Sequence, residues 1–62
     1  MDPKAHARYL AYLERFDYFR RPGHVKLDRE SFLALDRELT TLLRTDPHNP
    51  RIPPLRRALL RD

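Results

Sequence analysis

The side chains able to support catalysis are a single serine, three histidines and a set of carboxylates, and cysteine is absent. Ser31 falls at the third position of a predicted helix, where a serine ordinarily bonds the local backbone. His6, His24 and His48 form no ligand pair of the H-x-x-x-H type and match no metal-binding spacing. We therefore expect isolated surface histidines, although the two loop histidines would form a site if the fold brought them together beside a carboxylate.

One carboxylate has an unusual position, because Asp36 lies at the margin of an otherwise apolar helix face. A carboxyl group desolvated in this way is found in some active sites. Buried charges are more often paired, so we expect Asp36 to form an ion pair with an arginine of a neighbouring helix. The single glycine, Gly23, excludes a glycine-rich phosphate-binding loop. The sequence thus predicts no enzyme: no catalytic residue, metal ligand or cofactor, and no small-molecule substrate.

Tyrosine, arginine and leucine side chains indicate binding more clearly than any group indicates catalysis. Tyrosine and arginine are enriched at the energetically dominant positions of protein interfaces. Leucines outside the main apolar faces add exposed apolar area, which on a small protein often marks a contact surface. The predicted partner-binding residues are Tyr9, Tyr12, Arg15, Tyr18, Leu33, Arg56, Arg57, Leu60 and Arg61. For Tyr18, Leu33 and Leu60, burial in the protein's own core explains the pattern equally well. Core positions are expected for Phe16, Phe32, Leu35 and Leu39.

Basic residues concentrate at the two ends of the chain. The chain has 13 lysines and arginines against nine acidic residues, a net charge of +4, and its only lysines are Lys4 and Lys26. Clustered arginines with an aromatic ring to stack on bases suit nucleic acid. The residues concerned are the C-terminal Arg51, Arg56, Arg57 and Arg61, and on the first helix Arg8, Arg15 and Tyr18.

Three observations weaken the nucleic-acid reading. Acidic residues are interspersed, the connection of about eight residues between the helices is long for a helix-turn-helix motif, and no RNA-binding signature is present. A solvated helix face, an acidic protein partner or a GC-rich genome explains the arginines as well. Nucleic-acid binding therefore remains the alternative hypothesis.

The helical periodicity of the apolar residues predicts the helices that carry the candidate binding residues. Asp2 can cap a helix whose first position is Pro3, where a missing N–H costs no hydrogen bond. One face of this helix is apolar, with spacings of three and four residues. Its members are Tyr9, Tyr12, Leu13, Phe16 and Phe19. Pro22 and Gly23 form a predicted turn, so the first helix is expected over about 3–20.

The second helix has a clearer start. Asp28 is a suitable N-cap, and Leu27 and Phe32 occupy the positions of a hydrophobic staple. Its apolar face then continues with the residues Phe32, Leu35, Leu39, Leu42 and Leu43. Asp46 precedes a proline, which disfavours helix there. We expect this helix over 29–45.

Prolines dominate the rest of the chain, and residues 46–54 are expected to run in an extended, polyproline-like form. A short helix over about 54–61 carries Leu55 and Leu59 and must dock or fray. No period-2 alternation indicates a strand. The predicted fold is all-α: an antiparallel helical hairpin with a proline-rich arm and a short C-terminal helix, forming one small domain over 1–62.

A chain of 62 residues without cysteine has no disulfide or thiolate zinc site to stabilise it. Close helix packing or assembly with a partner must replace them. No apolar run approaches the roughly 20 residues of a membrane span, and Met1–Lys4 leads into a polar segment unlike a secretory signal. We therefore expect a cytoplasmic protein that does not enter membranes. It would be a non-catalytic interaction module, such as an adaptor, inhibitor or regulatory subunit, that binds a protein partner or itself as a homodimer.

Overall fold

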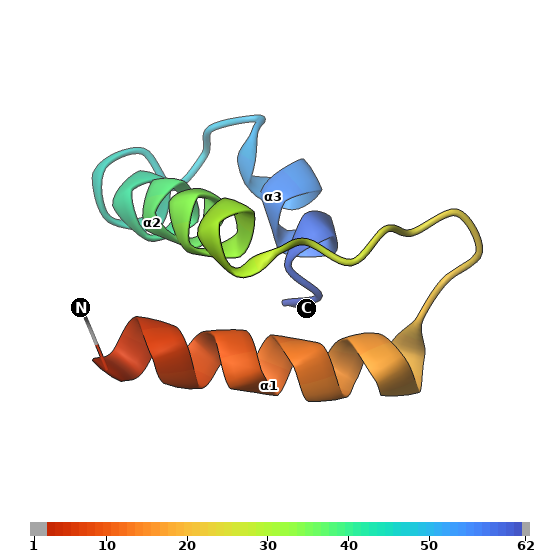
Figure 1. The fold of residues 1–62 in the computed structure, drawn as a ribbon. Helices are drawn as coiled ribbons and strands as arrows, with labels where there is room; N and C mark the ends of the chain where they lie inside the picture. Colours follow the sequence, from red (N-terminus) through yellow and green to blue (C-terminus); the bar gives the residue numbers. More distant parts are fainter. Residues whose placement is uncertain (1–2, 62) are drawn as a thin grey trace.

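The fold is all-α, as predicted, and α2 is its central element. The computed structural model describes residues 3–61, which contain three α-helices and no strand: α1 (Pro3–Phe19), α2 (Arg29–Thr45) and α3 (Ile52–Ala58). α2 packs against both other helices, and Figure 1 shows α2 and α3 on the same side of α1. The predicted Asp2 cap lies outside the described residues. In the described part of the chain, no helix is both long and apolar enough to cross a membrane.

α1 ends at Phe19, one residue earlier than predicted, and a turn follows at the predicted place. The N–H of His24 donates to the carbonyl of Arg21 at 3.0 Å, and Gly23 adopts a φ of 81°. This positive φ at the third position of a turn is the reason for glycine there. The connection continues to α2, and the N–H of Leu27 donates to the Tyr12 hydroxyl at 2.7 Å. That bond fastens the loop to α1.

α2 has the bounds that the sequence predicts. Asp28 has extended backbone angles, and its Oδ1 accepts the N–H of Ser31 at 3.0 Å, which is the expected N-cap. At the other end the N–H of Asp46 donates to the carbonyl of Leu42. Phe32 and Leu39 are fully buried on the face toward the other helices.

The proline-rich segment differs from the prediction. Residues 46–51 form two successive turns instead of an extended arm, with N–H donation from Asn49 to Asp46 and from Ile52 to Asn49, both at 3.0 Å. α3 begins at Ile52, so Pro53 and Pro54 lie in its first turn. The N–H groups of a first helical turn have no partner in the helix, and prolines fit there for that reason.

α3 ends at Ala58, three residues before the predicted end, in a Schellman motif. The N–H of Arg61 donates to the carbonyl of Arg56 at 2.9 Å, and that of Leu60 to the carbonyl of Arg57 at 3.3 Å. Leu60 has a φ of 54°, a left-handed conformation that glycine usually supplies. The motif turns the chain back, so that Leu60 and Arg61 reach α1 and α2.

The core is an aromatic cluster continued by leucines and one isoleucine. The ring centroids of Tyr12 and Phe32 are 4.7 Å apart, and those of Tyr12 and Phe16 are 5.9 Å apart. All three helices and the final turn contribute buried hydrophobic residues. These are Tyr12, Phe16, Phe32, Leu39, Ile52, Leu55, Leu59 and Leu60. Phe19, predicted on the same apolar face of α1, is outside this core.

Candidate functional site

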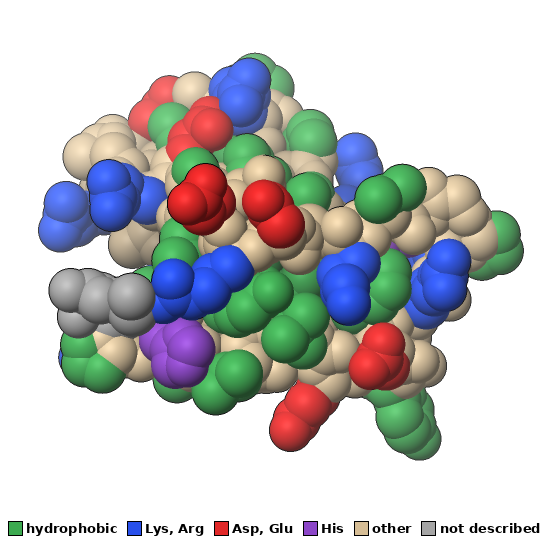
Figure 2. All heavy atoms as spheres, viewed as in Figure 1, with side chains coloured by type: hydrophobic (Ala, Val, Ile, Leu, Met, Phe, Trp, Pro, Cys, Tyr) green, Lys and Arg blue, Asp and Glu red, His purple; other side chains and the backbone are tan. Residues whose placement is uncertain are grey.

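The most exposed aromatic side chains lie together on the last turn of α1. Tyr18 is 81% exposed and Phe19 is 58% exposed, and their ring centroids are 4.7 Å apart. Arg15 is exposed one turn earlier. We call Arg15, Tyr18 and Phe19 the aromatic patch. Hydrophobic side chains project in Figure 2 from the right of the view, where α1 ends and the loop to α2 begins.

Two shallow hollows adjoin the aromatic patch. One of about 410 Å³ is lined by the patch and Glu14. The other, of about 190 Å³, is lined by Arg15, Phe19, Arg21 and Leu60. Phe19 and Arg15 form a wall of both, so the hollows are neighbours on one surface. The side chains that line this surface offer apolar contact and arginine donors.

Positive charge surrounds the aromatic patch. Arg15, Arg20 and Arg21 are exposed at the end of α1, and the guanidinium of Arg20 lies 5.7 Å from the centre of the Phe16 ring. Lys26 adds a charge in the following loop, while Glu14 and Asp17 are the acidic residues of the same stretch. Residues 14–26 therefore carry four cations and two acids, a net charge of +2.

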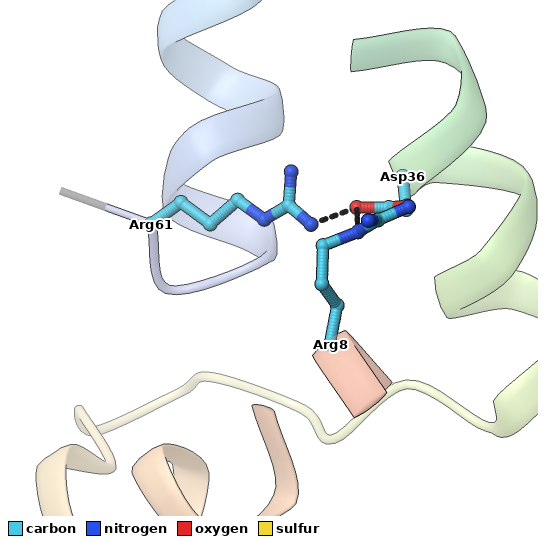
Figure 3. Close-up of polar contacts among 3 residues, drawn as sticks. All are labelled: Arg8, Asp36 and Arg61. Carbon is cyan, nitrogen blue, oxygen red and sulfur yellow. Dashed lines mark hydrogen bonds and ion pairs between the residues drawn. The ribbon is translucent and has the colours of Figure 1, made fainter. Parts of the chain in front are cut away.

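A second charged feature joins all parts of the fold (Figure 3). The carboxylate of Asp36 on α2 is only 1% exposed and accepts from two arginines. Arg8 of α1 donates through Nε at 3.1 and 3.0 Å and through Nη2 at 2.7 Å. Arg61, after α3, donates to the other side of the carboxylate through Nη2. The predicted pairing of Asp36 with an arginine of a neighbouring helix is confirmed.

Partial burial lowers the pKa of the Arg61 guanidinium, the Asp36 carboxylate opposes this by raising it, and Arg8 lowers it further. Since arginine starts from a very high pKa, Arg61 stays charged.

The structure separates the predicted partner-binding residues into four groups. Tyr12 and Leu60 are buried in the core. Tyr12 is therefore not presented on the surface of this fold, and for Leu60 the alternative of core burial is the one observed. Tyr12 belongs to the apolar face of α1 that packs into the core, and the Schellman motif brings Leu60 beside the end of α1. Tyr9 and Leu33 are half-buried against the core. Arg61 is engaged by Asp36.

The remaining predicted residues, Arg15, Tyr18, Arg56 and Arg57, are exposed. Arg8, which the sequence grouped with Arg15 and Tyr18 as a candidate for nucleic-acid binding, reaches with its side chain across to Asp36. Phe19 was expected on the apolar face of α1 that packs into the core. Phe19 is exposed because the last turn of α1 extends past the other helices, as Figure 1 shows. The periodic pattern identifies the apolar face of a helix but does not indicate where the helix packed against it ends. The one available signal was the position of Phe19 at the end of α1, far from its middle.

The histidines lie in different surroundings. His24 packs its ring 5.3 Å from that of Phe16, and its buried Nε2 has no hydrogen-bond partner among the described residues. His6 and His48 are exposed. Over residues 3–61, no three histidine or acidic side chains are grouped closely enough to hold a metal ion.

Comparison of the chain with protein-family models, with curated proteins and with solved structures finds no match.

Proposed function

We propose that this protein is a non-catalytic protein-interaction module whose contact surface is the aromatic patch. The observation that carries the proposal is the pair of touching rings of Tyr18 and Phe19, which remain largely exposed on a protein of this size. Folding gains nothing from leaving two aromatic rings in water, whereas binding gains apolar burial from them. Arg15 beside the rings completes a combination typical of interface hot spots.

The charge around the aromatic patch favours an acidic partner. Residues 14–26 have a net charge of +2, so a partner segment with apolar side chains flanked by aspartate or glutamate is complementary to it. Two copies of this surface facing each other would bring like charges together. We therefore propose a different protein as partner in preference to a homodimer. A cytoplasmic location remains part of this proposal and rests on the cysteine-free composition.

Nucleic-acid binding by the C-terminal arginines is the alternative. Arg56 and Arg57 are exposed on the last turn of α3 and support it. Arg51 and Arg61 donate to Glu38 and Asp36 within the protein, which leaves the arm less charge for phosphates than the sequence indicated. The interaction module is better supported for this reason.

Affinity capture from the native cell with matched variants tests the proposal. Tyr18→Ser/Phe19→Ser removes both exposed rings, and it leaves the core unchanged because neither residue belongs to it. Val25→Ser is the control, since Val25 is also a highly exposed apolar residue but lies in the loop. We expect one or more proteins to be captured by the unaltered protein and by Val25→Ser and lost with the double variant. Circular dichroism establishes that all three proteins are folded.

Sedimentation of the pure protein over a range of concentrations gives the second readout. If the protein is a monomer at every concentration, the result agrees with a separate protein partner. If it is a dimer that Tyr18→Ser/Phe19→Ser dissociates, self-association through the aromatic patch replaces the proposal of a different partner. Equal capture by all three proteins would show that the aromatic patch is not the interface.

A further inference from the structure

A groove at the other end of α1 has a composition unlike the rest of the surface. It lies between the first turns of α1 and the second half of α2 and has a volume of about 330 Å³. Its polar lining is Arg8, Asp36, Arg37, Thr40, Thr41 and Arg44. Its apolar lining is Ala5 and Leu33. A volume near 300 Å³ is at the small end of the range for small-molecule sites. The groove is separate from the aromatic patch.

The polar residues of α2 face the groove together because of their spacing. Arg37, Thr40, Thr41 and Arg44 are separated by three, one and three residues, which places them on one side of a helix. The side chains of Arg37 and Arg44 form no ion pair or hydrogen bond with the described residues. Figure 2 shows lysine and arginine side chains over α2 and around the start of α1, at the left of the view.

The groove has an excess of positive charge. Three arginines and one carboxylate line it, which leaves two charges uncompensated. The carboxylate of Asp36 does not present free acceptor oxygens to an incoming anion, since Arg8 and Arg61 donate to both of them. Its effect is to fix the guanidinium of Arg8 at the wall of the groove. The electrostatic complement of two excess charges is a dianion.

We infer that this groove binds the phosphate monoester of a small molecule. A phosphate monoester carries between one and a half and two negative charges at neutral pH and has three acceptor oxygens. Arg37 and Arg44 clamp the phosphate, and the hydroxyls of Thr40 and Thr41 donate to it. Leu33 and Ala5 contact the apolar group that the phosphate esterifies. The sequence analysis expected no small-molecule substrate, and this inference adds a small-molecule ligand without a catalytic step.

Phenyl phosphate is the probe, and NMR of the isotope-labelled full chain measures its binding. We expect amide shifts at Thr40, Thr41 and Arg44, and an affinity for phenyl phosphate at least about tenfold higher than for benzoate, which has the same ring but a single charge. Inorganic phosphate distinguishes recognition of the free anion from recognition of an ester. Equal affinity for both would remove the apolar part of the inference. Absence of shifts in the groove with phenyl phosphate at millimolar concentration would overturn it.

Two double variants of equal charge change separate a site from general attraction. Arg37→Gln/Arg44→Gln should weaken phenyl phosphate binding at least about tenfold, because it removes both clamping donors. Arg56→Gln/Arg57→Gln on α3 should change it less than about twofold, since these arginines are outside the groove. Equal weakening by both would mean nonspecific charge attraction and contradict the inference.

If Arg37→Gln/Arg44→Gln fails to fold, Thr40→Val/Thr41→Val is the substitute test, because it keeps all charges and removes the two hydroxyl donors. It should also weaken the binding of phenyl phosphate. A single-stranded oligonucleotide is titrated in the same NMR experiment. If it binds more tightly than phenyl phosphate and shifts the signals of both Arg37/Arg44 and Arg56/Arg57, nucleic-acid binding replaces the inference.

Discussion

At the scale of single residues, the dominant feature is the carboxylate of Asp36 between two guanidinium groups. Desolvating a charge is costly, and the cost is offset only when its partners have good geometry. Arg8 meets this condition through three hydrogen-bond contacts, and Arg61 adds a donor on the other side. The three residues come from α1, α2 and the segment after α3, so the ion pairs connect these three segments.

We predict that Asp36→Asn destabilises the protein by about 2 kcal/mol, because two partly buried arginines lose their counter-charge. The value is below that for a fully buried pair, since the side chains of Arg8 and Arg61 remain 37% and 27% exposed. Glu38→Gln is the control on the same helix: it removes an exposed ion pair with Arg51 and should cost less than about 0.5 kcal/mol. Urea unfolding followed by circular dichroism measures both. Equal effects would show that burial adds nothing to the Asp36 interaction.

At the scale of elements, the start of α2 links helix formation to pH. The hydrogen bonds that Asp28 accepts from the side chain and the backbone of Ser31 lower the pKa of its carboxyl. A carboxyl with a lower pKa in the folded state contributes stability above its unfolded pKa. That contribution is lost as the pH falls through the folded value. It is therefore present at neutral pH and absent in strong acid.

The corresponding prediction compares the unaltered protein with Asp28→Asn, which can still cap the helix but does not titrate in this range. The difference in urea midpoint between the two should be larger near pH 6 than below about pH 3, because the cap carboxylate is protonated in acid. Asp28→Ala is the control, since it removes the cap and should be less stable than Asp28→Asn at both pH values. A difference that does not change with pH would contradict the assigned role of the Asp28 charge.

The sequence predicted elements well wherever a local signal determined them. The bounds of α2 follow from the Asp28 cap and from the Asp46-Pro47 pair, both of which act within one turn. α3 was misplaced because a proline run is compatible both with extended chain and with a first helical turn, and tertiary packing of Ile52 and Leu55 decides between them.

The candidate site was only partly predictable from the sequence. Tyr18 and Arg15 were chosen from residue type and are exposed, and their role in binding stays a prediction. Phe19, expected on the buried face of its helix, is exposed, and of the two readings left open for Leu60 the structure has core burial. The reason is that Leu60 takes a left-handed conformation that no local pattern of leucines indicates. The groove beside Arg37 and Arg44 depends on the approach of α1, which the sequence does not encode locally.

At the scale of the whole molecule, thickness limits what can be buried. The described part of the chain measures 31 × 28 × 16 Å along its principal axes. A helix with its side chains is about 10–12 Å across, so 16 Å has no room for a third layer. Each helix therefore keeps one face in water. The exposed hydrophobic residues are Leu10, Tyr18, Phe19, Val25 and Leu43. Their exposure follows from this shape, and the partner proposed above would cover Tyr18 and Phe19 among them.

The same geometry makes the C-terminal segment a structural part of the core instead of an appendage. It supplies four of the eight buried hydrophobic residues: Ile52, Leu55, Leu59 and Leu60. We predict that a chain ending at Arg51 loses most of its helical circular dichroism signal, because 17-residue helices such as α1 and α2 are marginal in water without packing. Arg56→Ala/Arg57→Ala in the full chain is the control and should keep that signal, since both side chains are exposed. A shortened chain that still unfolds cooperatively, with a midpoint near that of the full chain, would mean that α1 and α2 fold without the segment.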